Sequence, residues 1–265
     1  LMSKKRFIYW LVSIVVSLFL IGYIWLSDDL NILFYSLLVG LLIMPNFTFK
    51  KMEKQKLMQI IIYYSQTGDA DEYLKQLKAH DENMVRTRKI KWYQATTYAQ
   101  VYLDKGSFEE AKKILIELVE FEPKFNKLTK FLYYRAWINY FLNYNKIAET
   151  QTLLVQLNNL IEASPVSLQQ QFILAYQILL AKYNIRCNNL LNETKATIKQ
   201  VININPTPLM VSSSNFYLGI LEYKLGNFDE VKKIFAEVAS FNEQLHFVRK
   251  AKEYLQKLNE RYRID

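Results

Sequence analysis

The sequence predicts an all-α protein, in which an N-terminal transmembrane helical hairpin precedes a stack of helix pairs and a closing helix. Only six Gly and five Pro occur in 265 residues, which is few for the many tight turns of a sheet protein. Long stretches are rich in Leu, Lys, Glu and Gln, which lose little side-chain freedom in a helix. Two uncharged runs near the N-terminus predict the transmembrane hairpin, and one sequence motif that occurs twice predicts the stack of helix pairs.

Residues 1–49 are predicted to form the two-span hairpin. The runs "FIYWLVSIVVSLFLIGYIWL" (Phe7–Leu26) and "LNILFYSLLVGLLIMPNFTF" (Leu30–Phe49) contain no charged residue. About twenty apolar residues are what a helix needs to cross a bilayer. Trp10 and Trp25 near the ends of the first run match the aromatic belt of the interface. The alternatives are a buried soluble hairpin, a single span followed by an interfacial helix, and a cleaved signal peptide, which lacks a small-residue cleavage site here.

Basic residues on both flanks of the hairpin predict its orientation. "KKR" precedes the first span, and residues 50–56 follow the second as a basic juxtamembrane linker. Positive residues stay on the cytoplasmic side, so both termini are expected in the cytoplasm and the chain is expected to be a two-span protein of the cell membrane. The linker is also expected to contact anionic headgroups through Lys50, Lys51, Lys54 and Lys56.

Beyond the linker, one sixteen-residue sequence motif, which we call the repeated phrase, occurs twice. "GSFEEAKKILIELVEF" starts at Gly106 and "GNFDEVKKIFAEVASF" starts at Gly226, and eight of the sixteen positions are identical. In the first copy Gly ends one helix and small Ala111 lets the next pack closely. This pattern resembles the tetratricopeptide repeat (TPR) family, at Ala99, Tyr102, Gly106, Phe108, Ala111, Leu115, Leu118 and Pro123.

The resemblance implies a TPR-like α-solenoid over residues 57–243. Turns are expected near residues 68, 106, 144, 188 and 226, which gives about five helix pairs. The copies between the two clear ones are poorer, and the third is placed by Ala136 and Ala148, the expected small packing residues of its two helices. Residues 244–265 are expected to form a capping helix and tail, because a terminal repeat would otherwise leave its apolar face in water.

No catalytic, cofactor-binding or metal-binding residue is predicted. The histidines His80 and His246 have no Cys or carboxylate at metal-ligand spacing, and the single Cys187 has no partner for an intramolecular disulfide. The common phosphate-binding, nucleophile-elbow and helical zinc motifs do not occur. The acid pairs Glu109-Glu110 and Asp229-Glu230 suit helix N-termini. The chain is therefore interpreted as not an enzyme, without a cofactor.

What the resemblance implies instead is a binding surface. In that family the first helix of each pair lines a concave groove that takes peptides or partner helices. The residues this implies are Tyr93, Thr96, Gln100, Leu103, Tyr133, Trp137, Tyr140, Phe216, Ile220 and Tyr223. Aromatic anchors on a rigid scaffold suit protein recognition.

The expected function is that of a bacterial membrane-anchored scaffold, which binds a protein or peptide partner and helps assemble or regulate a membrane complex. A net charge of +9 suggests an acidic partner or anionic lipid, and no nucleic acid is expected because no nucleic-acid-binding fold accompanies the charge. The alternatives are a peptide-sensing, ligand-sensing or immunity protein, and an accessory subunit of an integral membrane enzyme or transporter.

Overall fold

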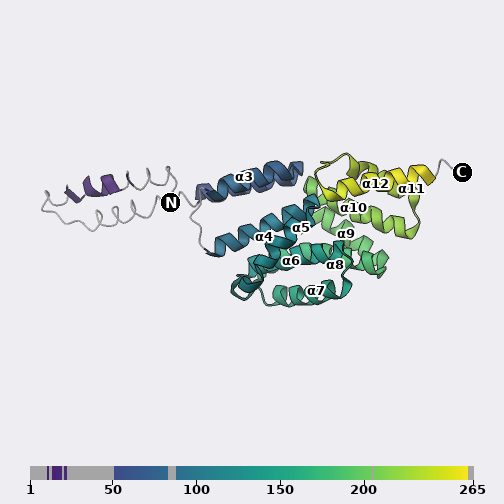
Figure 1. Cartoon of the computed structure of the whole chain (residues 1–265), viewed down its shortest axis with the longest axis horizontal. Helices are drawn as coiled ribbons and strands as arrows, with labels where there is room; N and C mark the ends of the chain where they lie inside the picture. Colours follow the sequence, from purple (N-terminus) through teal and green to yellow (C-terminus); the bar gives the residue numbers. More distant parts are fainter. Residues whose placement is uncertain are drawn as a thin grey trace. The chain divides into compact units, whose positions relative to one another are not determined.

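The computed structural model describes residues 11, 14–19, 21–22, 51–82, 88–204 and 206–261. Every regular element among them is helical, so the all-α prediction is confirmed. A helix at residues 51–67 is followed by the elements in Figure 1. These are α3 (Ala70–Glu82), α4 (Arg88–Lys105), α5 (Phe108–Glu117), η1 (Val119–Lys124), α6 (Lys127–Asn143), α7 (Ile147–Glu162), α8 (Val166–Cys187), α9 (Leu191–Ile204), α10 (Pro208–Leu225), α11 (Phe228–Ala239) and α12 (His246–Arg261).

Most of the predicted hairpin, residues 1–49, lies outside the described residues, as does Lys50. Within the described part of the chain, none of the helices has the length and apolar character that crossing a membrane requires. Lys51, Lys54 and Lys56 are exposed at the start of the helix at 51–67.

The contacts divide the chain into two compact units. One consists of Leu1–Ile62 and Lys75–Arg86, and the other of Tyr63–Leu74 and Thr87–Asp265. The second unit holds the repeated phrase and the turns at Gly68 and Gly106.

A residue in the left-handed conformation marks every predicted turn. The backbone φ is 64° at Gly68, 80° at Gly106, 57° at Asn145, 56° at Asn188 and 81° at Gly226. At Gly106 the amide of Ser107 donates to the carbonyl of Tyr102, 2.8 Å away, and the amide of Gly106 donates to that of Leu103 at 2.9 Å. This is the Schellman arrangement, which satisfies carbonyls at a helix end. The same pair of bonds recurs at Asn145 and Gly226.

The second helix of each pair buries a triad at constant spacing. In α5 and its C-cap it is Ala111, Leu115 and Leu118, and in α11 it is Val231, Phe235 and Val238. In α7 the corresponding residues are Thr150, Leu154 and Leu157. Ala148 is exposed, so the expectation that it is the small packing residue of the third pair is wrong. The hydroxyl of Thr150 is satisfied instead by the carbonyl of Lys146, 2.7 Å away, which allows a polar residue in a fully buried position.

Contacts join the two helices of each pair and also the first helices of successive pairs. The pairs are α4 with α5, α6 with α7, α8 with α9 and α10 with α11. The first helices pack in the order α4, α6, α8 and α10, and α12 contacts α10, α11 and α4 (Figure 1). Two apolar clusters fill the spaces: one around Leu115 and Phe125, between α4, α5 and α6, and one around Ile138 and Leu157, between α6, α7 and α8.

Candidate functional site

A chain of hydrogen bonds crosses the first helices of three pairs. The ammonium of Lys182 in α8 donates to Oδ1 of Asn139 in α6, 2.9 Å away. Nδ2 of Asn139 donates to Oε1 of Gln100 in α4 at 3.4 Å, and Nε2 of Gln100 donates to Oδ1 of Asp104 at 2.8 Å. Every donor therefore points from Lys182 towards Asp104, and bonds aligned in this way polarise one another.

Both ends of the chain are extended by tyrosines. The hydroxyl of Tyr64 donates to the second carboxylate oxygen of Asp104, 3.0 Å away. At the other end the ammonium of Lys182 lies 4.6 Å from the ring centroid of Tyr217 in α10, a cation–π contact. We call Tyr64, Asp104, Gln100, Asn139, Lys182 and Tyr217 the polar row. Hydrogen bonds and one cation–π contact join the end of the helix at 51–67 to α4, α6, α8 and α10 through this row.

The three central residues of the polar row occupy the same repeat position. Gln100, Asn139 and Lys182 each lie six residues before the left-handed residue of their turn, which is Gly106, Asn145 or Asn188. Equal spacing from equivalent turns places them on the same face of equivalent helices. The fifth pair has Ile220 at this position, and Ile220 is half-buried.

The polar row has an acidic group, Asp104, at one end and a cation, Lys182, near the other. Burial raises the pKa of Asp104, although the nearby charge of Arg135 and the hydrogen bonds from Gln100 and Tyr64 oppose that effect. Burial also raises the pKa of Tyr64, so its hydroxyl stays protonated and donates. Among the described residues, no acidic side chain lies within ion-pair distance of Arg135 or Lys182. The row can therefore offer positive charge to an acidic group.

The predicted groove residues separate into two sets. Thr96, Leu103, Tyr133, Tyr140 and Phe216 are buried in the helix packing. Tyr93, Gln100, Trp137, Ile220 and Tyr223 are half-buried. Of the ten, only Gln100 belongs to the polar row, and Ile220 shares its repeat position.

The third pair has its register two residues later than expected. The turn residue is Asn145, so Arg135 and Asn139 correspond to Thr96 and Gln100 of the second pair. Tyr133, Trp137 and Tyr140 instead pack with the apolar cluster between α4, α5 and α6. The sequence lacks a glycine that would mark this turn. Asn145 takes the left-handed conformation instead, and Asn is one of the few residues besides Gly that does so readily. Asn139 and Lys182 are identified only once the turns at Asn145 and Asn188 are known.

A second polar cluster lies in the other unit. Nε2 of His80 lies 3.3 Å from a carboxylate oxygen of Glu53, and its Nδ1 lies 3.6 Å from that of Asp81. All three side chains are buried. The nearby carboxylate of Asp81 raises the pKa of His80, although burial opposes it. The described residues contain no group of His, Cys, Asp or Glu arranged to hold a metal ion.

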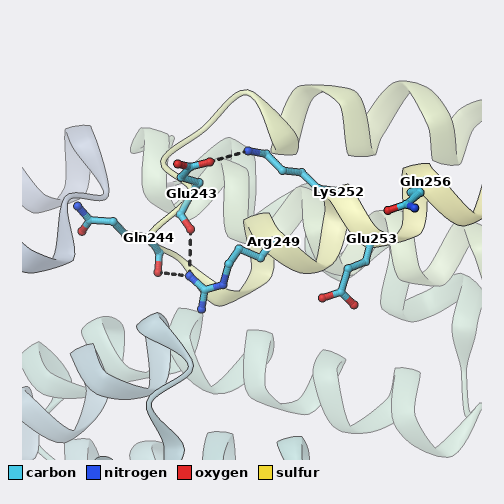
Figure 2. A pocket seen from close by; sticks show the side chains of 6 residues that line it. All are labelled: Glu243, Gln244, Arg249, Lys252, Glu253 and Gln256. Carbon is cyan, nitrogen blue, oxygen red and sulfur yellow. Dashed lines mark hydrogen bonds and ion pairs between the residues drawn. The ribbon is translucent and has the colours of Figure 1, made fainter.

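The surface also has a shallow depression of about 510 Å³ on α12, lined by Glu243, Gln244, Arg249, Lys252, Glu253 and Gln256 (Figure 2). Its charged groups already pair with neighbours. Arg249 donates to the carbonyls of Glu243 and Gln244, and Lys252 donates to the carboxylate of Glu243 (Figure 2). These pairs leave it less suited to a ligand than the polar row.

Comparison with protein-family models, with curated proteins and with solved structures finds no match to the chain. The geometry of the chain itself therefore supplies the basis for a function.

Proposed function

We propose that the protein is a membrane-anchored helical-repeat scaffold that binds a protein partner along the first helices of its repeats and helps assemble or regulate a membrane-associated complex. The observation that carries the proposal is the polar row. Gln100, Asn139 and Lys182 repeat at one position on successive helices. Among the described residues no acidic side chain lies within ion-pair distance of Lys182 or Arg135, although both lie near enough to Asp104 for their charges to lower its pKa. A surface that repeats a polar contact along its length suits an extended segment of a partner.

The same geometry supports a TPR-like solenoid as the scaffold. Left-handed residues end the first helices at Gly106, Asn145, Asn188 and Gly226, and buried triads follow each turn at matching spacing. Such repeats contact mainly their neighbours, as the pairs do here. No enzyme activity and no nucleic-acid binding form part of the proposal.

The chemistry of the polar row favours an acidic partner segment. Lys182 of the row and Arg135, whose charge acts on Asp104 beside it, supply positive charge, while the amides of Gln100 and Asn139 supply donors and acceptors. The net charge of +9 adds attraction at longer range.

Membrane anchorage rests on the sequence of residues 1–56. Two uncharged runs followed by exposed Lys51, Lys54 and Lys56 favour a hairpin whose basic end faces the inner leaflet. This topology is tested by the single Cys187. A membrane-impermeant thiol reagent is expected to label it in opened membranes only, and labelling from outside intact cells would contradict the cytoplasmic placement.

The binding proposal is tested by cross-linking and mass spectrometry of the full chain in its native membrane. Three proteins are compared: the wild type, Lys182→Gln, and the matched surface variant Lys113→Gln, which changes an exposed lysine of α5. Cross-links from a partner to the helices of the polar row should persist in Lys113→Gln and fall in Lys182→Gln. Unchanged cross-links in Lys182→Gln would contradict the proposal.

A deletion of residues 1–49 separates the scaffold from an accessory subunit. A scaffold is expected to keep its partner when the soluble part is added back to stripped membranes. Loss of the partner would instead favour recognition through the spans. Capture of a small ligand and no protein by the soluble part would favour a ligand sensor.

A further inference from the structure

The C-terminal helix closes a circuit of helix contacts. The first helices pack from α4 to α6, α8 and α10, and α12 then packs against both α10 and α4 (Figure 1). The last element of the chain therefore meets the second pair directly. An open stack of repeats would leave these two ends apart, since each repeat would contact only its neighbours.

Residues 241–249 make this closing contact, and we call them the clasp. One side of the clasp meets the turn at Gly68. Nδ2 of Asn242 donates to the carbonyl of Thr67 at 3.3 Å, and Oε1 of Gln244 accepts from the amide of Asp71 at 3.0 Å. A Cβ on Gly68 would lie 2.6 Å from the ring of Phe241, so side chain and backbone are in close contact here.

The other side of the clasp meets the turn at Gly106. A Cβ on Gly106 would lie 2.8 Å from Nδ1 of His246, and the ring of Phe108 meets His246 edge to face, with centroids 5.0 Å apart. Arg249 donates to the carbonyl of Lys105 and also to those of Glu243 and Gln244, at 3.0 and 2.7 Å (Figure 2). Arg249 thus links the clasp to the turn.

The clasp can separate without unfolding α12. The contact between α12 and α11 is extensive, and Val248, Ala251 and Leu258 are buried on α12. The contacts to the two turns combine single hydrogen bonds with the side chains of Phe241, Leu245 and His246. The contact of α12 with α4 is much smaller than its contact with α11. A smaller contact opens at a lower free energy than the core does.

We propose that the clasp closes the circuit only while His246 is neutral, and that protonation of His246 releases residues 241–249 from the turns at Gly68 and Gly106. The clasp does not depend on the proposed partner binding. Its release would open the circuit of first helices that carries the polar row.

The surroundings of His246 favour its neutral form. Burial lowers the pKa of His246, and the charges of Lys250 and Arg249 lower it further, while Glu253 acts in the opposite direction. Across the contact, the ammonium of Lys105 is paired with Asp71. A histidine whose pKa is depressed in the closed form binds its proton more readily in the open form. Closure is therefore complete above the ordinary histidine pKa of about 6.5 and is lost as the pH falls below it.

Hydrogen exchange of the full chain in detergent, read by mass spectrometry, tests the clasp. Amides of residues 102–110 and 241–250 are compared at about pH 7.5 and about pH 5.5, after correction for the intrinsic rates. We expect protection there to fall by up to about tenfold at the lower pH, because a histidine with the ordinary pKa of about 6.5 in the open form is about nine-tenths protonated at that pH. Protection in Phe131–Leu142 of α6 should stay unchanged.

Three variants separate His246 from other titrating groups. His246→Gln is neutral at both values and should show no change in protection between them. His246→Lys is charged at both and should show the open pattern throughout. His80→Gln, which changes the other histidine of the chain, should respond as the wild type does. A pH response that persists in His246→Gln, or a loss of protection spread equally over α6, would overturn the proposal.

Discussion

The hydroxyl of Tyr64 donates to the carboxylate of Asp104 across 40 residues of sequence, at 3.0 Å. Tyr64 is buried and stacks on Tyr73, with ring centroids 4.3 Å apart and planes 8° from parallel. Asp104 accepts a second bond from Gln100. Within the polar row this contact therefore ties the helix at 51–67 to α4, so a change at Tyr64 should affect both the stability of the chain and the geometry of the row.

Tyr64→Phe is expected to lower the free energy of unfolding by about 1–3 kcal/mol, because Asp104 loses one of its two donors while it stays partly buried. Urea unfolding followed by circular dichroism measures the change. The neighbouring Tyr63→Phe serves as the control, since Tyr63 is exposed, and it should change the stability by less than about 0.5 kcal/mol. Equal effects of the two variants would argue against a structural role for the Tyr64–Asp104 bond.

Asp104→Asn should alter the dependence of stability on pH. Burial raises the pKa of Asp104 in the folded chain, so the folded state holds this proton more tightly than the unfolded state does. The wild type should therefore gain stability from Asp104 as the pH falls from neutral through the raised folded pKa, and lose it again as the pH rises. Asp104→Asn should lack this gain when the two proteins are unfolded with urea at a series of pH values. Parallel curves would show that Asp104 is not held with a raised pKa.

The two turn glycines of the repeated phrase should differ in their tolerance of Asn. Both have a left-handed φ, which Asn145 and Asn188 adopt at equivalent turns, so backbone strain is small in either case. A Cβ at Gly226 meets nothing within 4 Å, whereas one at Gly106 would lie 2.8 Å from His246. Gly106→Asn should cost about 1–3 kcal/mol by crowding, and Gly226→Asn less than about 1 kcal/mol. Similar melting temperatures for the two variants would contradict the close contact at His246.

Lys195 is expected to matter far more than other surface lysines. It donates to the carboxylate of Glu222, which is 1% exposed and also accepts from Asn227 at 2.7 Å. Burial raises the pKa of Glu222, but the bonds from Lys195 and Asn227 lower it by more, so Glu222 stays charged in the core. Lys195→Ala should lower the unfolding free energy by about 1–3 kcal/mol, because it leaves that charge with one partner.

The matched control for Lys195 is Lys146→Ala, which removes an exposed ion pair with Glu149, 3.7 Å away. Exposed pairs contribute about 0–1 kcal/mol. A loss in Lys195→Ala no larger than in this control would show that Glu222 does not depend on Lys195.

Much of the helical layout could be predicted because local chemistry determines it. Gly106 and Gly226 each end a helix through their left-handed conformation, which depends on local sequence alone, and the small or apolar residues that follow them pack at fixed spacing. The third helix pair is harder to predict from the sequence, because Asn145 stands where the turn glycine is expected and Thr150 where the small packing residue is expected. A two-residue error in register follows, and it moves the expected groove residues of α6 to another face.

The polar row could not be predicted from the sequence. Those of its hydrogen bonds that join different helices connect residues 39 to 43 positions apart, so only the packing of those helices brings Gln100, Asn139 and Lys182 together. The contacts of His246 with Phe108 and Gly106 depend in the same way on where α12 returns to the second pair. The local sequence around His246, a single histidine in a helix rich in charged residues, does not indicate such a contact.

Site-specific photo-cross-linking in the native membrane tests the proposed binding surface most directly. The photoreactive residue replaces Ile220, which shares the repeat position of the polar row but makes none of its hydrogen bonds, or Val155, which is 56% exposed on α7. We expect one protein partner to be captured at Ile220 and not at Val155, and we expect Lys182→Gln to reduce that capture. Capture of the same partner at Val155 but not at Ile220 would contradict a partner site along the first helices.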